Sequence, residues 1–256
     1  MNLLINFATD DFKRAQQFNS KTAMSVGGFE HVFNASTTLI DDHFRSKHSL
    51  ILNQSKGAGY WLWKPYFILQ ALDRLKDGDV LMYADSASHF IHPAEPLLNL
   101  PKSFGQDVIP FELELEEGRW TKRDTFVYMN VDQMNYEKSQ QFLASFIVIR
   151  KSQFSLHFIN EYLTYCCNPN ILTDLENTCG LPNHSGFVAH RHDQSVFSLL
   201  CKKYSLTGFR DPSQWGNSRV AEYQNSQYPQ ILEHTRQKIP KQSKPLYRLK
   251  RFFFPK

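Results

Sequence analysis

Short apolar runs alternate with segments of helical periodicity along this chain. Residues 3–8 form a short, mostly apolar run, which is typical of a buried strand. In 63–76 the apolar side chains recur at helical spacing instead, and Asp77-Gly78-Asp79 ends that helix with a turn. A second compact apolar run, 80–84, follows directly. A helix, a turn and a buried strand in this order indicate an open α/β sheet.

The same pattern extends over most of the chain. Further strands are predicted at 31–35, 108–115 and 144–149, and further helices at 9–25, 38–45, 152–167 and 193–204. A chain of 256 residues fits one large α/β domain, and neither a repeat nor a low-complexity segment interrupts it. We therefore predict an α/β fold with a mostly parallel central sheet in a single domain, 1–235, followed by a tail, 236–256.

The composition is that of an ordinary folded protein, with 41% hydrophobic and 21% charged residues. The four cysteines show no metal-binding spacing. No apolar stretch approaches the roughly 18 residues of a membrane span. The first residues lack the charged and apolar regions of a signal peptide. We therefore expect a reduced, cytoplasmic protein.

Charge is distributed unevenly between the body of the chain and its C-terminal end. The net charge is +4, but eight basic and no acidic residues follow Glu233, which leaves −4 for the rest. Residues 249–254 combine cations with aromatic rings, a mixture that favours an anionic membrane interface over nucleic acid. We expect the tail to hold the protein at the inner face of the membrane. A solvated tail is the alternative.

Two glycines precede the predicted helix 63–76. Gly57 and Gly59 allow the backbone to approach a ligand closely, and the start of the helix offers free N–H groups to an anion. Lys64 adds a positive charge that suits a diphosphate. The alternative is a tight turn among buried tryptophans.

Asp85 directly follows the predicted strand 80–84 and is flanked by Tyr83 and Ser86. Ligands of open α/β sheets bind just beyond the carboxyl ends of the strands, so we expect these side chains at a binding site. A carboxylate there suits a divalent cation, Mn²⁺ or Mg²⁺, which would neutralise a nucleotide diphosphate. A turn residue is the alternative.

Two later clusters carry candidate chemistry. Lys122 and Arg123 suit a phosphate, and Asp124 suits an acceptor hydroxyl, although such clusters are often simply solvated. Asp193 opens a predicted helix and is a candidate general base that takes the proton of an attacking sugar hydroxyl. A helix cap is the alternative. His192, beside it, is expected with Asp124 to contact the acceptor.

The order of these clusters resembles bacterial glycosyltransferases of the GT-A fold, which act in capsule, O-antigen and other surface polysaccharide synthesis. The resemblance is carried by GAGYWLWKPY at 57–66, GDVLMYAD at 78–85, KRD at 122–124, ASFIVIRK at 144–151 and HRHDQS at 190–195. The first and last blocks are the distinctive ones. The resemblance covers the chain to about His234 and implies a Rossmann-like domain that binds a nucleotide sugar.

In this fold an Asp-x-Asp motif binds the metal and the donor diphosphate, and Asp85 resembles one of its aspartates. The second carboxylate is missing, because Tyr83 and Ala87 occupy the positions two residues to either side. His234 resembles the late histidine that completes the metal site in some members. Asp193 resembles the catalytic base of inverting members, whereas retaining members need no such base.

These expectations combine into a glycosyltransferase, expected to be a hexosyltransferase, that moves a sugar from a nucleoside-diphosphate sugar to a glycan or lipid-linked acceptor hydroxyl. The resemblance places the nucleoside against Phe7, Ala8 and Thr9. The other expected donor contacts are Lys64, Tyr83, Asp85, Ser86, Lys122 and Arg123. A sugar-phosphate nucleotidyltransferase is one alternative, although Thr9-Asp10-Asp11 stands where its Gly- and Lys/Arg-rich loop would be. A catalytically inactive, surface-binding relative is the other.

Overall fold

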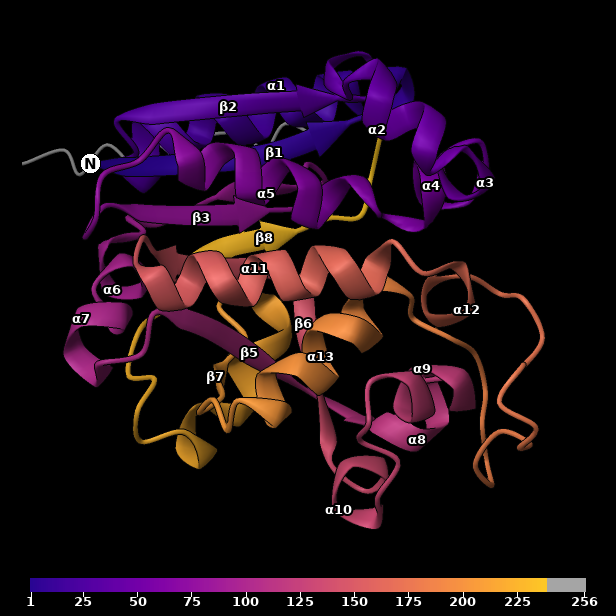
Figure 1. Cartoon of the computed structure of the whole chain (residues 1–256). Helices are drawn as coiled ribbons and strands as arrows, with labels where there is room; N and C mark the ends of the chain where they lie inside the picture. Colours follow the sequence, from indigo (N-terminus) through magenta and orange to yellow (C-terminus); the bar gives the residue numbers. More distant parts are fainter. Residues whose placement is uncertain (239–256) are drawn as a thin grey trace, which may run out of the picture.

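A mixed sheet of six strands forms the centre of residues 1–238, which are the part of the chain that the computed structural model describes (Figure 1). The strand order is β2 (His31–Ser36), β1 (Asn2–Ala8), β3 (Val80–Ala84), β6 (Gln140–Arg150), β5 (Val108–Glu116) and β7 (Phe209–Arg210). β1 is parallel to β2 and β3, and β5 is parallel to β7, whereas β6 is antiparallel to both of its neighbours. The predicted α/β class with a mostly parallel sheet is confirmed.

Side chains alternate across this sheet and build a core on each face. Leu3 and Ile5 of β1 join one core, whereas Leu4 between them joins the other. The helices α5 (Trp63–Asp73), α11 (Gln153–Cys166) and α13 (Asp193–Lys203) cover the first face. Figure 1 shows α5 and α11 lying side by side along the strands. Each strand therefore contributes side chains to two buried layers. This is why short apolar runs in the sequence predicted the long strands.

Two short strands bring a late part of the chain beside β3. β4 (Ser88–Phe90) and β8 (Leu232–His234) are antiparallel, with Ser88 opposite His234. The position of β4 just after Asp85 places β8 at the same edge of the central sheet (Figure 1). Strands of this length contain too few residues for a periodic pattern, so the sequence did not predict them.

The other elements are α1 and short helices. α1 (Lys13–Thr22) packs against β1 and β4. The short helices are η1 (Asp10–Phe12), η2 (Ala23–Gly27), η3 (Thr37–Leu39), α2 (Asp42–Lys47), α3 (Ser49–Leu52), α4 (Gly57–Tyr60), α6 (Glu95–Leu98), α7 (Leu100–Phe104), α8 (Glu117–Trp120), α9 (Arg123–Tyr128), α10 (Met134–Glu137), α12 (Pro169–Leu172) and η4 (Gln214–Glu222). Within residues 1–238 no helix has the length and apolarity that a membrane crossing requires. Most of the predicted tail, 239–256, lies outside the described residues.

Candidate functional site

A cavity of about 840 Å³ opens at the carboxyl ends of β1 and β3. This is the edge at which ligands bind in α/β sheets, and the volume is in the range of small-molecule sites. Leu113 of β5 and Leu143 of β6 extend the wall on the far side. The structure brings together seven of the predicted site residues on this wall: Phe7, Ala8, Thr9, Tyr83, Asp85, Ser86 and His234.

Asp85 and Ser86, at the end of β3, are held by contacts with both neighbouring strands. The Asp85 backbone N–H donates to the Ser145 carbonyl of β6 at 2.9 Å, and the Tyr83 hydroxyl donates to Asp85 Oδ1 at 2.7 Å. The next residue, Ser86, donates from Oγ to the Phe7 carbonyl at 2.5 Å, which ties the end of β3 to β1. The Asp85 side chain remains 29% exposed, so its Oδ2 is accessible to a ligand.

His234 of β8 faces the accessible oxygen of Asp85. Its Nε2 lies 4.0 Å from Asp85 Oδ2, and its ring packs edge-on against Phe146. Burial lowers the pKa of His234, and the Asp85 carboxylate only partly opposes this shift. The imidazole is therefore neutral at pH 7, which is the form that binds metal ions.

Asp85 and His234 fit a divalent cation as two members of a ligand set. A carboxylate oxygen and a neutral imidazole nitrogen are both ligands of metals such as Mn²⁺. Within residues 1–238, no three His, Cys, Asp or Glu side chains gather to hold a metal ion by themselves. A cation here would therefore need oxygens from a ligand or water to complete its coordination, as Mg²⁺ commonly does at substrate phosphates.

The turn around Gly57 and Gly59 builds an aromatic part of the wall. All residues from Gly57 to Trp61 have φ between +51° and +95°. This left-handed conformation costs each residue other than glycine roughly 1–2 kcal/mol. The turn places Trp61 on the cavity wall, and the Trp63 Nε1–H donates to the Gly57 carbonyl at 2.9 Å. Trp63 in turn stacks on Phe7 with ring centroids 3.6 Å apart.

Replacing Gly59 with alanine is expected to destabilise the protein more than the same change at Gly78. The φ angles are similar, +95° and +89°, so both variants strain the backbone. A Cβ at Gly59 would lie 2.8 Å from the Leu52 Cα, whereas nothing lies within 4 Å at Gly78. We expect urea unfolding to show a loss of about 2–5 kcal/mol for Gly59→Ala and about 1–2 kcal/mol for Gly78→Ala. Equal losses would contradict the close packing of this turn.

Lys64 and Asp193 form a buried ion pair behind the wall. Lys64 Nζ lies 2.5 Å from Asp193 Oδ2, and the two side chains are 4% and 5% exposed. Lys64 also donates to the Ala144 carbonyl, and the Tyr162 hydroxyl donates to the Asp193 carbonyl. Burial raises the pKa of Asp193, and the Lys64 ammonium opposes that rise. Neither side chain belongs to the cavity wall, although Gln194, next to Asp193, does.

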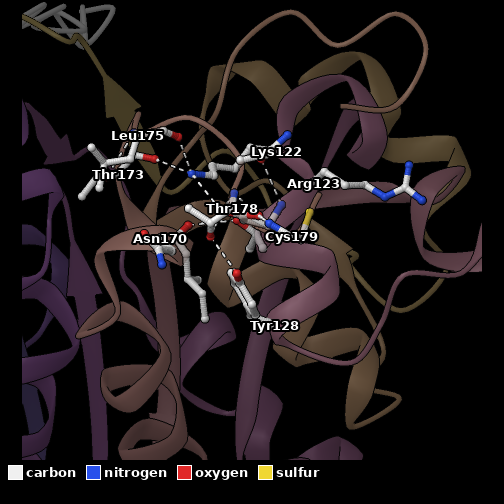
Figure 2. A network of polar contacts seen from close by, with 12 residues as sticks. Lys122, Arg123, Tyr128, Asn170, Thr173, Leu175, Thr178 and Cys179 are labelled. Carbon is white, nitrogen blue, oxygen red and sulfur yellow. Dashed lines mark hydrogen bonds and ion pairs between the residues drawn. The ribbon is translucent and has the colours of Figure 1, made fainter. Parts of the chain in front are cut away.

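Lys122 and Asp124 anchor the irregular segment that follows α12. Figure 2 shows Lys122 beside Leu175 of this segment. Lys122 Nζ donates to the Leu175 carbonyl at 2.6 Å. Asp124 accepts the backbone N–H groups of Thr178 and Cys179 at 2.8–2.9 Å. Both anchoring side chains are buried, and neither lies on the cavity wall. The structure therefore places these two predicted ligands in a network that fixes a loop.

Arg123 and His192 also lie off the cavity wall. Arg123 forms an ion pair with Asp132 at 2.8 Å. His192 stacks against Trp61 with ring centroids 5.5 Å apart, and its Nδ1 bonds to the Leu172 carbonyl. Its φ is +52°, a strained value for a residue other than glycine. His192 therefore packs against Trp61 and does not itself line the cavity.

The stability that Asp124 contributes is expected to disappear in acid. Burial raises the pKa of Asp124, but hydrogen bonds from Thr178 and Cys179 outweigh this, and the net pKa lies below the ordinary value of 3.8. A carboxylate whose folded pKa is lowered stabilises the protein above its unfolded pKa and loses that contribution as pH falls through the folded value. Urea unfolding of wild type and Asp124→Asn should therefore differ more at pH 7 than at pH 3. An equal difference at both values would contradict this.

The wall also contains residues that the sequence did not identify as ligands. Arg191 and Arg236 bring two positive charges to the cavity, and Trp215 adds a ring that is 58% exposed. Arg191 belongs to the motif at 190–195, so the sequence could have identified it as a site residue. Arg236 had been assigned to the tail, and only the pairing of β8 with β4 brings it to the cavity.

No protein-family model and no curated protein matches the chain. Among solved structures it is similar to mouse xyloside xylosyltransferase 1 in its apo form, with 11% identity and a TM-score of 0.49 over 94% of this chain and 99% of that one. It is also similar to the galactosyltransferase LgtC, solved with donor and acceptor sugar analogues, with 13% identity and a TM-score of 0.44 over 91% of this chain and 86% of that one. The similarity to the bifunctional glycosyltransferase WbbM has 11% identity and a TM-score of 0.45 over 78% of this chain and 37% of that one. Similarities of this size do not carry an activity over to this chain.

Proposed function

We propose that this chain is a glycosyltransferase that transfers a sugar, a hexose in our proposal, from a nucleoside-diphosphate sugar to an acceptor hydroxyl in surface polysaccharide synthesis. One observation carries the proposal. Asp85 Oδ2 and His234 Nε2 lie 4.0 Å apart on the wall of the 840 Å³ cavity, at the carboxyl ends of β1 and β3. The sequence motifs that resemble GT-A glycosyltransferases place their metal and diphosphate ligands at these same two residues.

The donor is proposed to lie across the ends of β1 and β3. Phe7, Ala8 and Thr9 line the part of the cavity at the end of β1, where the nucleoside would pack. The stacked rings of Phe7 and Trp63 make that side apolar and rigid. Asp85 would stand beside the diphosphate, since it is the carboxylate at the end of β3. The cavity would thus offer apolar rings to the base at one end of the nucleotide and a polar site to the phosphates at the other end.

Asp85 and His234 would hold Mn²⁺ or Mg²⁺ if the reaction uses a cation. Such a cation would neutralise charge on the diphosphate. The Tyr83 hydroxyl supports this role, because it fixes Asp85 Oδ1 and leaves Oδ2 facing His234. Burial keeps the His234 imidazole neutral, as its lowered pKa indicates.

Asp193 is proposed as the general base only in a form of the site that differs from the one observed. Its carboxylate is bound to Lys64 behind the wall, so it would have to release Lys64 to reach an acceptor hydroxyl. Its raised pKa favours accepting a proton. The acceptor is proposed to be a glycan or a lipid-linked glycan, the latter suggested by the basic aromatic sequence at 249–254, which lies outside the described residues.

Equilibrium binding tests the proposal directly. Wild-type protein should bind at least one member of a panel of nucleoside-diphosphate sugars, measured by titration calorimetry, with a Kd between about 1 μM and 1 mM, the usual range of substrate affinities. Ser145→Trp, which fills the cavity, should prevent this binding. Ser46→Trp, on the exposed surface of α2, should leave it unchanged. Failure of the whole panel to bind, or binding unaffected by Ser145→Trp, would refute the proposed site.

A further inference from the structure

Arg191 lines the cavity, and its guanidinium group is held against an aromatic ring. The guanidinium carbon lies 4.4 Å from the centre of the Trp120 ring, so the side chain is supported on one face. Its Nε is buried and has no hydrogen-bond partner within residues 1–238, and the same residues offer it no ion pair. The backbone of Arg191 is fixed by a hydrogen bond of 3.1 Å to the Trp120 carbonyl. The position of the Arg191 charge is therefore fixed, but no anionic group within residues 1–238 pairs with it.

Arg236 reaches the same cavity from the segment after β8. Its guanidinium carbon lies 5.7 Å from the centre of the Trp215 ring, which also lines the cavity. The backbone N–H groups of Thr235 and Arg236 both donate to the Ala87 carbonyl, at 2.9 and 3.1 Å. Arg236 has a positive φ of +55°. These contacts hold the guanidinium over the cavity although its side chain is exposed to solvent.

Two guanidinium groups in one cavity repel each other unless an anion lies between them. Burial lowers the pKa of Arg191, and the Arg236 charge lowers it further. An arginine nevertheless stays protonated, so the repulsion persists in the protein without ligand. No ion pair in the described part of the chain compensates either charge. A ligand that carries at least two negative charges would remove this unfavourable arrangement.

A diphosphate matches the chemistry of the pair. The planar guanidinium donates two parallel hydrogen bonds to phosphate oxygens, and such charge-assisted bonds are about twice as strong as neutral ones. Both arginines line the same cavity as Asp85, the residue proposed to stand beside the donor diphosphate. The second carboxylate of the motif, which would help to hold a metal ion, is missing. Positive side chains would neutralise part of the diphosphate charge themselves, so less of that neutralisation would depend on a metal ion.

We propose that Arg191 and Arg236 together bind the diphosphate group of the ligand in this cavity. The inference rests on the proposed function for the identity of that ligand, but the anion site itself follows from two guanidinium groups that have no ion pair within residues 1–238. It also gives the segment 235–238 a role, because the chain after β8 completes the site. Lys238 supports this placement through an ion pair at 2.5 Å with Asp11, which lines the cavity.

The test is the binding of inorganic pyrophosphate and of nucleoside diphosphates to the full-length protein, by calorimetry in the presence of a metal chelator. Arg191→Gln and Arg236→Gln should each weaken binding at least ~10-fold, and the double variant should weaken it further. Arg191→Lys should recover only part of the loss, because an ammonium lacks the planar pair of donors. Arg119→Gln, an exposed arginine off the cavity wall, is the matched control and should bind as wild type. Thermal unfolding confirms that each variant is folded.

The outcomes separate this inference from the proposed function. If both glutamine variants bind pyrophosphate and nucleoside diphosphates as tightly as wild type, the arginine site is wrong, even when nucleotide sugars are bound and turned over. If pyrophosphate binding depends on the two arginines but no nucleotide sugar binds, either with the chelator or with added Mn²⁺ or Mg²⁺, the anion site stands and the glycosyltransferase proposal fails. If folded wild-type protein binds neither ligand under either condition, both are wrong.

Discussion

Replacing Asp85 with alanine is expected to abolish sugar transfer while leaving the fold intact. The side chain is 29% exposed at the cavity wall and receives one hydrogen bond, from the Tyr83 hydroxyl, so its removal costs little stability. In contrast, its Oδ2 lies 4.0 Å from His234 Nε2 on the cavity wall. Loss of such an electrostatic contact at a reacting diphosphate lowers kcat by about 10²–10³-fold or more.

The measurement is transfer or donor hydrolysis with purified variants of equal Tm. Asp85→Asn keeps the shape of the side chain but not its charge, so it should lose nearly as much activity as Asp85→Ala. Asp10→Ala is a matched control, because Asp10 is an exposed aspartate that is not on the cavity wall. An Asp85→Ala variant with unimpaired transfer would remove this residue from the site.

Replacing Lys64 with methionine is expected to cost about 3–5 kcal/mol of unfolding free energy, because it leaves a buried carboxylate without its partner. Both side chains of the Lys64–Asp193 pair are at most 5% exposed. Lys64 also lies 5.0 Å from the centre of the Tyr83 ring, so the pair supports the strand that carries Asp85. Asp193→Leu should cost a similar amount for the same reason.

A double-mutant cycle in urea tests this account. The variant Lys64→Met/Asp193→Leu should lose much less stability than the sum of the single variants, since it leaves no unpaired charge. Additive losses would show that the pair is not coupled.

The milder Asp193→Asn variant tests whether Asp193 acts in catalysis. If it folds and turnover falls roughly 10²-fold without a change in donor affinity, Asp193 acts as the general base. If turnover and affinity fall together, its role is structural.

The long elements of the fold could be predicted from sequence because each has a buried face. The strand 80–84 and the helix beginning at Trp63 carry apolar patterns that local spacing reveals. The placement of Asp85 at the carboxyl end of β3 follows from the same pattern, since a polar residue after a buried strand must lie at the sheet edge. The position of Phe7 follows likewise from β1.

Contacts between residues far apart in sequence could not be predicted in this way. Lys64 was expected at a phosphate, but its partner Asp193 comes from a helix 129 residues later. Asp124 was expected at an acceptor, yet its hydrogen bonds go to Thr178 and Cys179 of a loop without any periodic pattern. Arg236 reaches the cavity only because the three-residue strand β8 pairs with β4. The spacing of charged residues in the sequence does not distinguish a residue that forms a buried ion pair from one that binds a ligand.

The release of nucleoside diphosphate from a panel of nucleotide sugars, incubated with the wild-type protein, tests the central claim most directly. We predict that one or a few donors are cleaved to the sugar and a nucleoside diphosphate, faster with a suitable acceptor hydroxyl. Cleavage between the two phosphates, with inorganic pyrophosphate as co-substrate, would instead indicate a nucleotidyltransferase. Release from no donor, with or without Mn²⁺ or Mg²⁺, would contradict the assignment of this cavity to sugar transfer.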